Sequence, residues 1–206
     1  MAGETVDRKR VFDLAVTLPA MAASLPLQAV VAVVVRCEFG RPVLFRQQRP
    51  GLHGEPFEML KFRTMLAPDP ARGLVDDASR LTRVGRILRA TSLDELPSLW
   101  NVLRGDMSLV GPRPLLMQYL PRYTAEQARR HDVRPGLTGL AQVSGRNALT
   151  WERKLELDVE YVDSHTLGGD VAILLATVGR VLRRDGIAAA ESVTMPEFMG
   201  TARVDG

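Results

Sequence analysis

The longest apolar run of the chain lies in its first forty residues. Nearly every position from Val11 to Val35 is apolar. The polar residues and prolines that interrupt the run are Asp13, Thr17, Pro19, Ser24, Pro26 and Gln28. As a straight helix, a run of this length would measure roughly 37 Å at about 1.5 Å per residue, which is enough to cross a bilayer.

Two features of this run argue against a simple crossing. Basic residues flank it on both sides, namely Arg8, Lys9 and Arg10 before it and Arg36, Arg41, Arg46 and Arg49 after it. The positive-inside tendency would place both ends in the cytoplasm. Near the middle, Pro26 removes a hydrogen-bond donor, leaves the carbonyl of Ala22 unpaired and bends the helix. We therefore predict a re-entrant anchor over residues 1–40 that kinks near Ser24 and Pro26 and returns to the same face.

Two other interpretations of the run stay open. A basic start, an apolar stretch and the small residues of Ala-Met-Ala-Ala-Ser also resemble a cleaved signal peptide. The same run suits a buried helix in the core of a soluble protein. Fractionation separates the three cases, because a processed, soluble product would exclude the anchor.

Shorter patterns follow the apolar run. Two segments are typical of strands, Val43–Arg49 and Phe57–Arg63, joined by a turn built on Pro50, Gly51 and Gly54. Residues 67–77 carry Pro, Gly and Asp and predict a surface loop. Four further helices are predicted. The first is short and amphipathic, marked by Leu81, Val84 and Leu88, and the second runs from Leu96 or Pro97 to Leu103 and is ended by Gly105. The third has Trp151, Leu155, Val159 and Val162 along one face, and the fourth is an apolar helix over Val171–Leu182.

These patterns predict an α-rich α+β fold with a single membrane-associated domain and interfacial amphipathic helices. The anchor would occupy residues 1–40, the domain residues 41–190 and an irregular tail residues 191–206. A chain of 206 residues suits one domain with a substantial core. The formal charge of +3 suits a nucleotide, a nucleic acid or an anionic membrane. The single cysteine, Cys37, excludes an internal disulfide, and the three histidines lack zinc-ligand spacing.

The segment Thr91–Pro114 holds the strongest candidate chemistry. Adjacent carboxylates, Asp94 and Glu95, come just before Pro97. Since proline is favoured in the first turn of a helix, the pair is predicted at a helix N-terminus, where free N–H groups favour phosphate. A simpler interpretation is a capping box formed by Ser92 and Glu95.

The residues that follow favour phosphoryl transfer. Gly111-Pro112-Arg113-Pro114 predicts a rigid turn that presents one guanidinium, and a stiff backbone limits the entropy lost on clamping a phosphate. A carboxylate nucleophile, a divalent metal and several cationic side chains are the groups that phosphoryl transfer requires.

Four strings make the sequence recognisable: KRVFD, RPGLHGEPFEMLKFRTM, SLDELPSLWNVLRGDMSLVGPRP and RHDVRPGLTGLAQVSGRNALTW. From Lys9 to about Gly186 the chain resembles the bacterial sugar transferase family, specifically its small monotopic polyprenyl-phosphate phosphoglycosyl transferases. The resemblance is closest to members that use UDP-activated N-acetylated amino sugars, as in N-glycan initiation.

The resemblance implies a ping-pong reaction. Asp94 attacks the β-phosphate of a UDP-sugar and expels UMP, and polyprenyl (undecaprenyl) phosphate then takes the phosphosugar. Glu95 assists proton handling or orients the acceptor, and Mg²⁺ bridges Asp94 and the diphosphate. Residues 41–190 become the catalytic domain.

The resemblance also implies phosphate-binding or site-shaping roles for a further set of polar residues, Lys61, Arg89, Arg113, Arg146 and Asp170. Each has a plainer interpretation. Lys61 suits a solvated strand position, Arg89 a helix C-terminus, and Arg146 a loop. Asp170 suits the cap of the helix that begins at Val171.

The implied setting is the cytoplasmic face of the bacterial inner membrane. Membrane lipid, the UDP-sugar and polyprenyl phosphate are the expected partners, and nucleic acid is not. One departure from the family concerns the kink, because Leu25 stands immediately before Pro26 where the family usually has serine.

Two functions from other classes remain as alternatives. The arginines of residues 80–89 suit a basic nucleic-acid-binding module, but aromatic residues make up only 5% of the chain and none interleave with these arginines. A non-catalytic membrane scaffold would keep the anchor and would need neither Asp94 nor Glu95.

Overall fold

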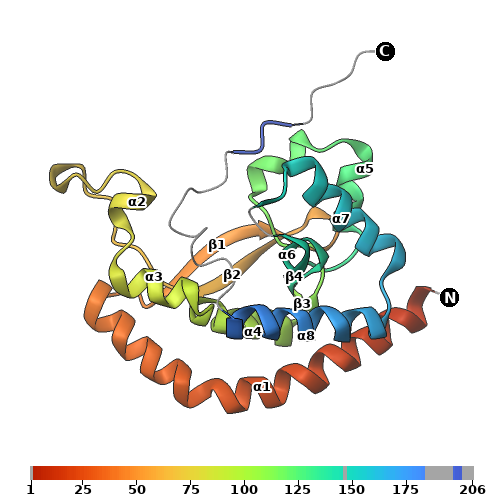
Figure 1. Ribbon diagram of the computed structural model, residues 1–206, viewed down its shortest axis with the longest axis horizontal. Helices are drawn as coiled ribbons and strands as arrows, with labels where there is room; N and C mark the ends of the chain where they lie inside the picture. Colours follow the sequence, from red (N-terminus) through yellow and green to blue (C-terminus); the bar gives the residue numbers. More distant parts are fainter. Residues whose placement is uncertain (1, 146–147, 184–196, 201–206) are drawn as a thin grey trace.

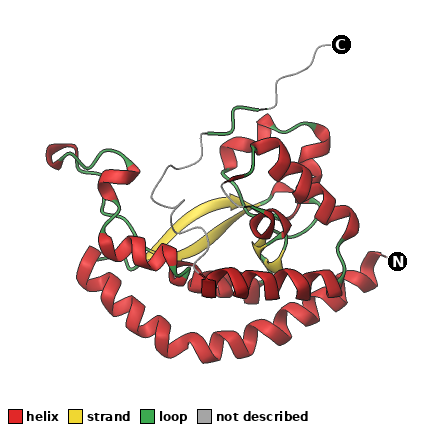
Figure 2. Cartoon of the chain, in the orientation of Figure 1, coloured by secondary structure: helices red, strands yellow, loops and turns green. Residues whose placement is uncertain are grey.

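The computed structural model describes residues 2–145, 148–183 and 197–200 (Figure 1). The described chain is mostly helical, with one long N-terminal helix and two small sheets (Figure 2). In chain order the helices and strands are α1 (Ala2–Phe39), β1 (Leu44–Pro50), β2 (Pro56–Phe62), α2 (Asp77–Arg80), α3 (Arg83–Ala90), α4 (Leu99–Arg104), β3 (Ser108–Val110), α5 (Ala125–Ala128), β4 (Gly136–Thr138), α6 (Leu140–Ser144), α7 (Trp151–Ser164) and α8 (Leu167–Arg183). Short 3-10 helices are η1 (Leu52–Gly54), η2 (Pro70–Arg72), η3 (Leu93–Ser98), η4 (Met117–Arg122) and η5 (Arg129–His131).

Helix α1 buries one stripe and exposes the rest of its apolar surface. The buried positions are Asp13, Thr17, Met21, Gln28, Val31, Val35 and Phe39. Large apolar side chains exposed elsewhere on the helix are Val11, Leu18, Leu25, Leu27, Val30, Val33 and Val34. The part from Arg8 to Phe39 is long and apolar enough to cross a membrane, and only 22% of its most apolar stretch is buried. A helix in the core of a soluble protein would instead be covered on all sides.

Helix α1 is continuous and bent. It forms an arc whose two ends turn toward the side on which the sheets lie (Figure 1). Both Pro19 and Pro26 lie inside it. The Ser24 hydroxyl donates to the carbonyl of Met21 at 3.0 Å and accepts from Gln28 at 3.0 Å. Ser24 therefore bonds to a different carbonyl from the one on Ala22 that Pro26 leaves unpaired.

Polar residues at the start of α1 attach it to the domain. The guanidinium of Arg10 donates to the carbonyls of Val102 and Leu103 at 2.5 and 2.7 Å, at the C-terminal end of α4. The buried carboxylate of Asp13 accepts the Leu109 N–H of β3 at 3.2 Å. In the sequence analysis the basic residues that flank the apolar run were explained by membrane topology alone. Arg10 has a second role, because it satisfies carbonyls that a helix end leaves without intrahelical partners.

Strands β1 and β2 form an antiparallel hairpin in which Leu44 pairs with Phe62 and Pro50 with Pro56. Both predicted strands are confirmed, with ends shifted by one residue.

Side chains from the helical segment η3–α4 satisfy the other edge of β2. The amide of buried Asn101 accepts from the Leu60 N–H at 3.0 Å and donates to the Glu58 carbonyl at 2.7 Å. The Ser98 hydroxyl donates to the Leu60 carbonyl at 2.7 Å. An unpaired strand edge needs partners for its N–H and C=O groups, and these two side chains fix η3–α4 against the hairpin.

Strands β3 and β4 are parallel, and glycines let the segments after them meet backbone to backbone. A Cβ atom on Gly136 would lie 2.1 Å from the Gly111 nitrogen, and one on Gly139 would lie 2.1 Å from the Gly111 oxygen. Gly111 donates to the Thr138 carbonyl at 2.9 Å, and Gly136 donates to the Pro112 carbonyl at 2.9 Å. The turn that carries Arg113 is therefore held by contacts that only glycine permits.

The starts of two predicted helices differ from the structure. The helix expected from Leu96 or Pro97 begins as the 3-10 helix η3 at Leu93, and α4 follows from Leu99 to Arg104. Helix α8 begins at Leu167, four residues before the predicted Val171, because Thr166 accepts the Gly169 N–H at 3.0 Å and supports an earlier start. Gly105 ends α4 in a left-handed conformation as expected, and α7 begins at Trp151.

Replacement of Asn101 by alanine is expected to lower the free energy of unfolding by about 3 kcal/mol, because it leaves the buried Leu60 N–H without an acceptor. Denaturant unfolding in detergent micelles measures the change. Arg104→Ala, at an exposed position of the same helix, is the control and should stay within about 0.5 kcal/mol of the wild type. Equal stability of both variants would contradict the role assigned to Asn101.

Candidate active site

The two predicted catalytic carboxylates lie in the first turn of η3. Ser92 precedes them with a positive φ of 56° and makes no capping hydrogen bond through its side chain. The capping-box interpretation of Ser92 and Glu95 is therefore wrong. The pair does start a helical turn, but the turn is a 3-10 helix, and Glu95 has partners elsewhere in the fold.

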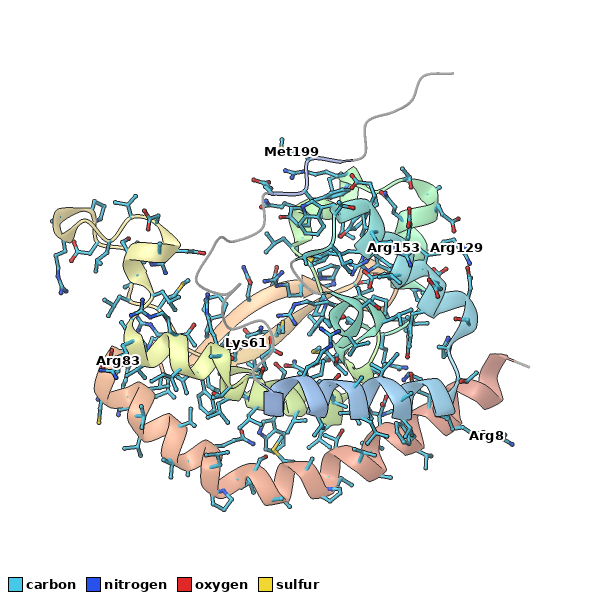
Figure 3. The ribbon with its side chains drawn as sticks, in the orientation of Figure 1. Arg8, Lys61, Arg83, Arg129, Arg153 and Met199 are labelled. Atoms are coloured by element: carbon cyan, nitrogen blue, oxygen red, sulfur yellow. The ribbon has the colours of Figure 1, made fainter. Side chains whose placement is uncertain are left out.

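Glu95 joins three segments through one oxygen atom. Its Oε1 accepts from the Lys61 Nζ of β2 at 2.6 Å and from the Arg113 Nη2 at 2.8 Å. Burial opposes ionisation of Glu95, but the charges of Arg113 and Lys61 outweigh it and lower the pKa of Glu95 far below its usual range. Burial in turn lowers the pKa of Lys61. Figure 3 shows Lys61 in the central part of the view, whereas Arg83 and Arg129 lie at the periphery.

Asp94 is buried beside this ion-pair group, with 7% of its surface exposed. Burial, together with the negative charge of Glu95, raises the pKa of Asp94 to about 6, against the opposing charges of Lys61, Arg89 and Arg113. Among the described residues, none donates a hydrogen bond to the Asp94 carboxylate. No described residue therefore competes with a metal ion or an electrophile for these oxygens, and the charges of Lys61, Arg89 and Arg113 act on them.

Arg89 reaches this group from α3 and is oriented by Thr64. Its Nε donates to the Thr64 hydroxyl at 3.0 Å. The helix can approach so closely because Gly85 has no side chain: a Cβ atom there would lie 1.9 Å from the Thr64 carbonyl oxygen. The plainer interpretation of Arg89 was a charge that only stabilises the C-terminus of its helix. The bond to Thr64 shows that Arg89 also contacts the end of the hairpin.

Two further cations of the site were missed at the sequence level. Burial, with a contribution from the charge of Arg113, lowers the pKa of Arg49 to about 10. Burial and Arg113 likewise lower the pKa of Lys154 of α7. Arg49 donates to the Gln47 side chain at 2.6 Å and to the Pro114 carbonyl at 3.4 Å. The available signal was its place as the first residue of the string RPGLHGEPFEMLKFRTM, immediately before Pro50 and Gly51.

Asp170 lies in a different polar group. It is fully buried in the first turn of α8, where it accepts from Lys9 Nζ at 2.6 Å and from the Tyr161 hydroxyl at 2.8 Å. Tyr161 also contacts the carbonyl of Val110 at 2.9 Å. The predicted cap at Asp170 is wrong, because the residue lies inside the helix. Its contacts connect α1 and α8 to strand β3.

The candidate Arg146 lies outside the described residues, so its predicted role stays a prediction.

Asp94 is the described residue that would hold a Mg²⁺ ion at this site. Within the described part of the chain, His, Cys, Asp and Glu side chains form no group of three or more that could hold a metal. Asp94 provides a carboxylate whose oxygens accept no hydrogen bond from these residues. Mg²⁺ is commonly held by one or two carboxylates together with phosphate oxygens and water, so the described residues match that mode better than an all-protein cage.

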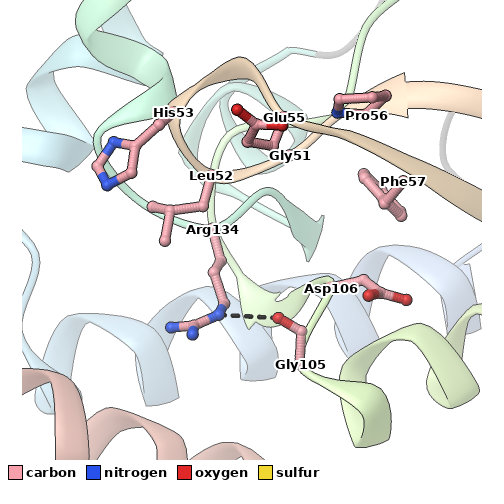
Figure 4. A pocket seen from close by; sticks show the side chains of 9 residues that line it. All are labelled: Gly51, Leu52, His53, Glu55, Pro56, Phe57, Gly105, Asp106 and Arg134. Atoms are coloured by element: carbon pink, nitrogen blue, oxygen red, sulfur yellow. Dashed lines mark hydrogen bonds between the residues drawn. The ribbon is translucent and has the colours of Figure 1, made fainter.

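A separate cavity of 310 Å³ lies at the hairpin turn (Figure 4). Its lining includes His53, Glu55, Asp106 and Arg134, and Arg134 donates to the Gly105 carbonyl at 2.8 Å. None of the residues that line it belongs to the group around Asp94 and Glu95.

Comparisons with a family model and with known proteins both point to bacterial sugar transferases. The family model for bacterial sugar transferases matches residues 4–184. The chain is similar to the uncharacterized sugar transferase EpsL of Bacillus subtilis, with 51% identity over 197 residues that cover 95% of this chain and 98% of the relative. It is similar to a UDP-glucose:undecaprenyl-phosphate glucose-1-phosphate transferase of Caulobacter vibrioides, with 46% identity over 190 residues, 86% of this chain and 71% of the relative. An undecaprenyl-phosphate galactose phosphotransferase of Salmonella typhimurium is 42% identical over 196 residues, 86% of this chain and 41% of the relative.

Replacement of Asp94 by asparagine is expected to stabilise the protein at high pH. The ordinary pKa of 3.8 applies to the unfolded chain and about 6 to the folded one, so stability falls as pH rises through this window. At pH 8 the neutral amide should raise the free energy of unfolding by about 2–3 kcal/mol. The gain should vanish near pH 4, where the aspartate is protonated in the fold. Unfolding is measured at both pH values with EDTA present, and a pH-independent effect would contradict the raised pKa.

Proposed function

We propose that this chain, which belongs to the bacterial sugar transferase family, transfers a sugar-1-phosphate from a UDP-sugar to undecaprenyl phosphate and releases UMP. The observation that supports this most directly is the buried Asp94 carboxylate, which accepts no hydrogen bond from the described residues and has Lys61, Arg89 and Arg113 close enough to influence its pKa. The names of the Caulobacter and Salmonella relatives support the acceptor. The non-catalytic scaffold and the nucleic-acid-binding module have no comparable observation in their favour.

In the proposed reaction Asp94 acts as nucleophile. One carboxylate oxygen forms a bond to the β-phosphorus of the UDP-sugar, while the bond between that phosphorus and the bridging oxygen breaks and UMP leaves with the electron pair. A phosphate oxygen of undecaprenyl phosphate then attacks the same phosphorus and displaces the Asp94 carboxylate. The raised pKa suits this role, since a carboxylate that is poorly solvated is more nucleophilic than one bonded to several donors, and it is ionised above about pH 6.

Glu95 would act as a positioning group in this scheme. Its low pKa keeps it ionised, so it is a poor proton donor near neutral pH. Through one oxygen it orients Lys61 and Arg113, which carry two positive charges against its single negative charge. The excess positive charge, with Arg89 beside it, would stabilise the charge that develops on the transferring phosphoryl group. When bound, Mg²⁺ would lower the repulsion between Asp94 and the diphosphate.

Helices α1, α4 and α8 expose apolar side chains that suit a position at the interface between membrane and water. Besides the exposed apolar side chains of α1, helix α8 exposes Leu167, Val171, Leu175 and Val178, and α4 exposes Trp100. We propose that α1 is a re-entrant helix in the bacterial inner membrane, with both ends and the domain of residues 41–190 on the cytoplasmic side. α8 would then lie in the interface as an amphipathic helix. The acceptor's phosphate lies at the same depth, because its polyprenyl chain stays in the bilayer.

Asp94→Asn is expected to reduce UMP release by about 10³-fold or more, because the amide cannot attack phosphorus. Wild-type enzyme incubated with donor alone should show a phosphosugar adduct on Asp94 by mass spectrometry. Chelation of divalent cations should stop UMP release. Asp132→Asn, an exposed acidic position, is the matched control and should behave as the wild type. Normal turnover by the Asp94 variant would exclude the mechanism.

The same assay identifies the donor. The resemblance predicts an N-acetylated amino sugar, whereas the names of the Caulobacter and Salmonella relatives give glucose and galactose. Parallel incubations with UDP-sugars of each class decide between them.

Cysteine labelling tests the topology of α1. Cys37 is exposed at the end of the helix and is the only cysteine of the chain. In a re-entrant helix, Cys37 and a cysteine introduced at Gly3 in a Cys37→Ser background should both react with a membrane-impermeant maleimide in inverted vesicles, and neither should react in right-side-out vesicles. Labelling of the two positions from opposite sides would mean that α1 spans the membrane.

A further inference from the structure

The segment Glu197–Gly200 lies against the catalytic domain although it has no regular secondary structure. Phe198 is only 1% exposed, in contrast to its neighbour Met199 at 77%. In Figure 3 Met199 lies at the outer edge of the molecule. The predicted tail of residues 191–206 therefore contains one residue, Phe198, that is buried against the domain. The backbone around it is irregular, but the segment is still held in place by its side-chain contacts.

Three aromatic rings enclose Phe198. Its ring centroid lies 5.7 Å from that of Tyr119, 5.6 Å from that of Tyr123 and 5.4 Å from that of Trp151. The Tyr123 contact is stacked and the Tyr119 contact is edge-to-face, both favourable geometries for aromatic pairs. These rings come from η4, the segment after it and α7, so the pocket is built entirely by the domain.

Polar contacts fix the position of the segment in the pocket. The Glu197 carboxylate accepts from Gln118 at 2.6 Å and from Arg122 at 2.8 Å. Arg122 also donates to the Phe198 carbonyl. An apolar anchor in a pocket with main-chain and side-chain hydrogen bonds beside it is how extended peptides are recognised by domains. The family match ends at residue 184, before this segment begins.

The wall of this pocket continues to the candidate active site. The Arg130 guanidinium lies 5.7 Å from the centre of the Tyr123 ring, on which Phe198 stacks. Arg130 Nη2 donates to the Arg113 carbonyl at 2.7 Å, and the Arg113 side chain contacts Glu95. Phe198, Tyr123, Arg130 and Arg113 thus form one continuous chain of contacts.

Burial makes this chain of contacts stiff. Arg130 and Asp158 form an ion pair at 2.7 Å, and both are almost completely buried. A buried guanidinium without full pairing is costly, so Arg130 cannot turn toward solvent when its surroundings change. Tyr123 is a further partner of Arg130, because its hydroxyl accepts from Arg130 Nη1 at 3.5 Å. Tyr123 therefore contributes, with Asp158, to the position of Arg130 and of the backbone that carries Arg113.

We propose that the C-terminal segment is an intramolecular peptide ligand of the domain, and that Phe198 is a positioning residue acting through Tyr123 and Arg130 on Arg113. The docking stands on the contacts alone. The effect on Arg113 as a phosphate-binding group rests on the proposed function. Arg113 would bind the donor's phosphate groups in the ground state as well as in the transition state, so loss of the Phe198 contact should be visible in the donor KM.

Fluorescence tests the docking without any assay of activity. The chain contains two tryptophans, so a Trp100→Phe background leaves Trp151 as the reporter. In this background Phe198→Ala should shift the emission to longer wavelength, because water gains access to Trp151. A synthetic peptide MPEFMGTAR, residues 195–203, should reverse the shift at millimolar concentration, the range that a short tether provides. The peptide MPEAMGTAR is the control and should have no effect.

Enzyme kinetics test the positioning role. Phe198→Ala is expected to raise the donor KM about tenfold with a smaller change in kcat, as for loss of a group that binds ground and transition states alike. The peptide MPEFMGTAR should restore the wild-type KM, Phe198→Tyr should retain it, and Met199→Ala should leave it unchanged.

Each outcome has a separate meaning. An unchanged emission of the Phe198→Ala variant, or equal effects of the two peptides, would overturn the docking. A normal donor KM in a variant whose emission has shifted would overturn the positioning role. If the wild type releases no UMP from any donor, the proposed function fails, and with it the positioning role, while the fluorescence titration still decides the docking.

Discussion

The site depends on one carboxylate oxygen that two cations share. Glu95 Oε1 receives Lys61 at 2.6 Å and Arg113 at 2.8 Å, and this joins the hairpin, the turn of η3 and the segment after β3. A partly buried, ionised glutamate needs both partners to offset its desolvation. Once the three groups are together, their net positive charge faces Asp94 and any phosphate beside it. The same contact therefore holds the fold together at this point and creates the local charge that phosphoryl transfer needs.

Uncharged groups bring the charged ones into place. Asn101 and Ser98 bond to the backbone of β2 and fix η3–α4, so that Lys61 and Glu95 meet. Gly85 allows α3 to contact the end of the same hairpin, while the glycines after β3 and β4 hold the turn with Arg113. Backbone contacts of this kind are short and inflexible, and they limit the entropy that the cationic side chains would lose on binding phosphate. The recognised strings of the sequence thus encode packing as much as chemistry.

The N-terminal helix packs firmly against the domain and is also the candidate for the membrane anchor. Arg10 satisfies carbonyls at the end of α4, whose preceding turn carries Asp94 and Glu95. Lys9 pairs with Asp170, and Asp13 accepts from β3, which leads into the Arg113 turn. The buried stripe of α1 faces the domain, and its exposed apolar surface is available to lipid. An enzyme built in this way fixes its reactive groups relative to the helix that would set their depth in a bilayer.

The sequence by itself determined the features that local physics controls. Alternation and turn residues predicted the hairpin to within one residue, Gly105 ended a helix because of its conformational freedom, and the four strings identified the family. Only the tertiary structure decided that Glu95 pairs with Lys61 and Arg113 instead of capping with Ser92. It also decided that Arg49 lies near Arg113, that Arg130 bonds to the Arg113 carbonyl and that Phe198 stacks on Tyr123. Each of these contacts joins residues far apart in the chain. Local periodicity and turn chemistry contain no information about them, because burial and desolvation arise only when distant segments pack together.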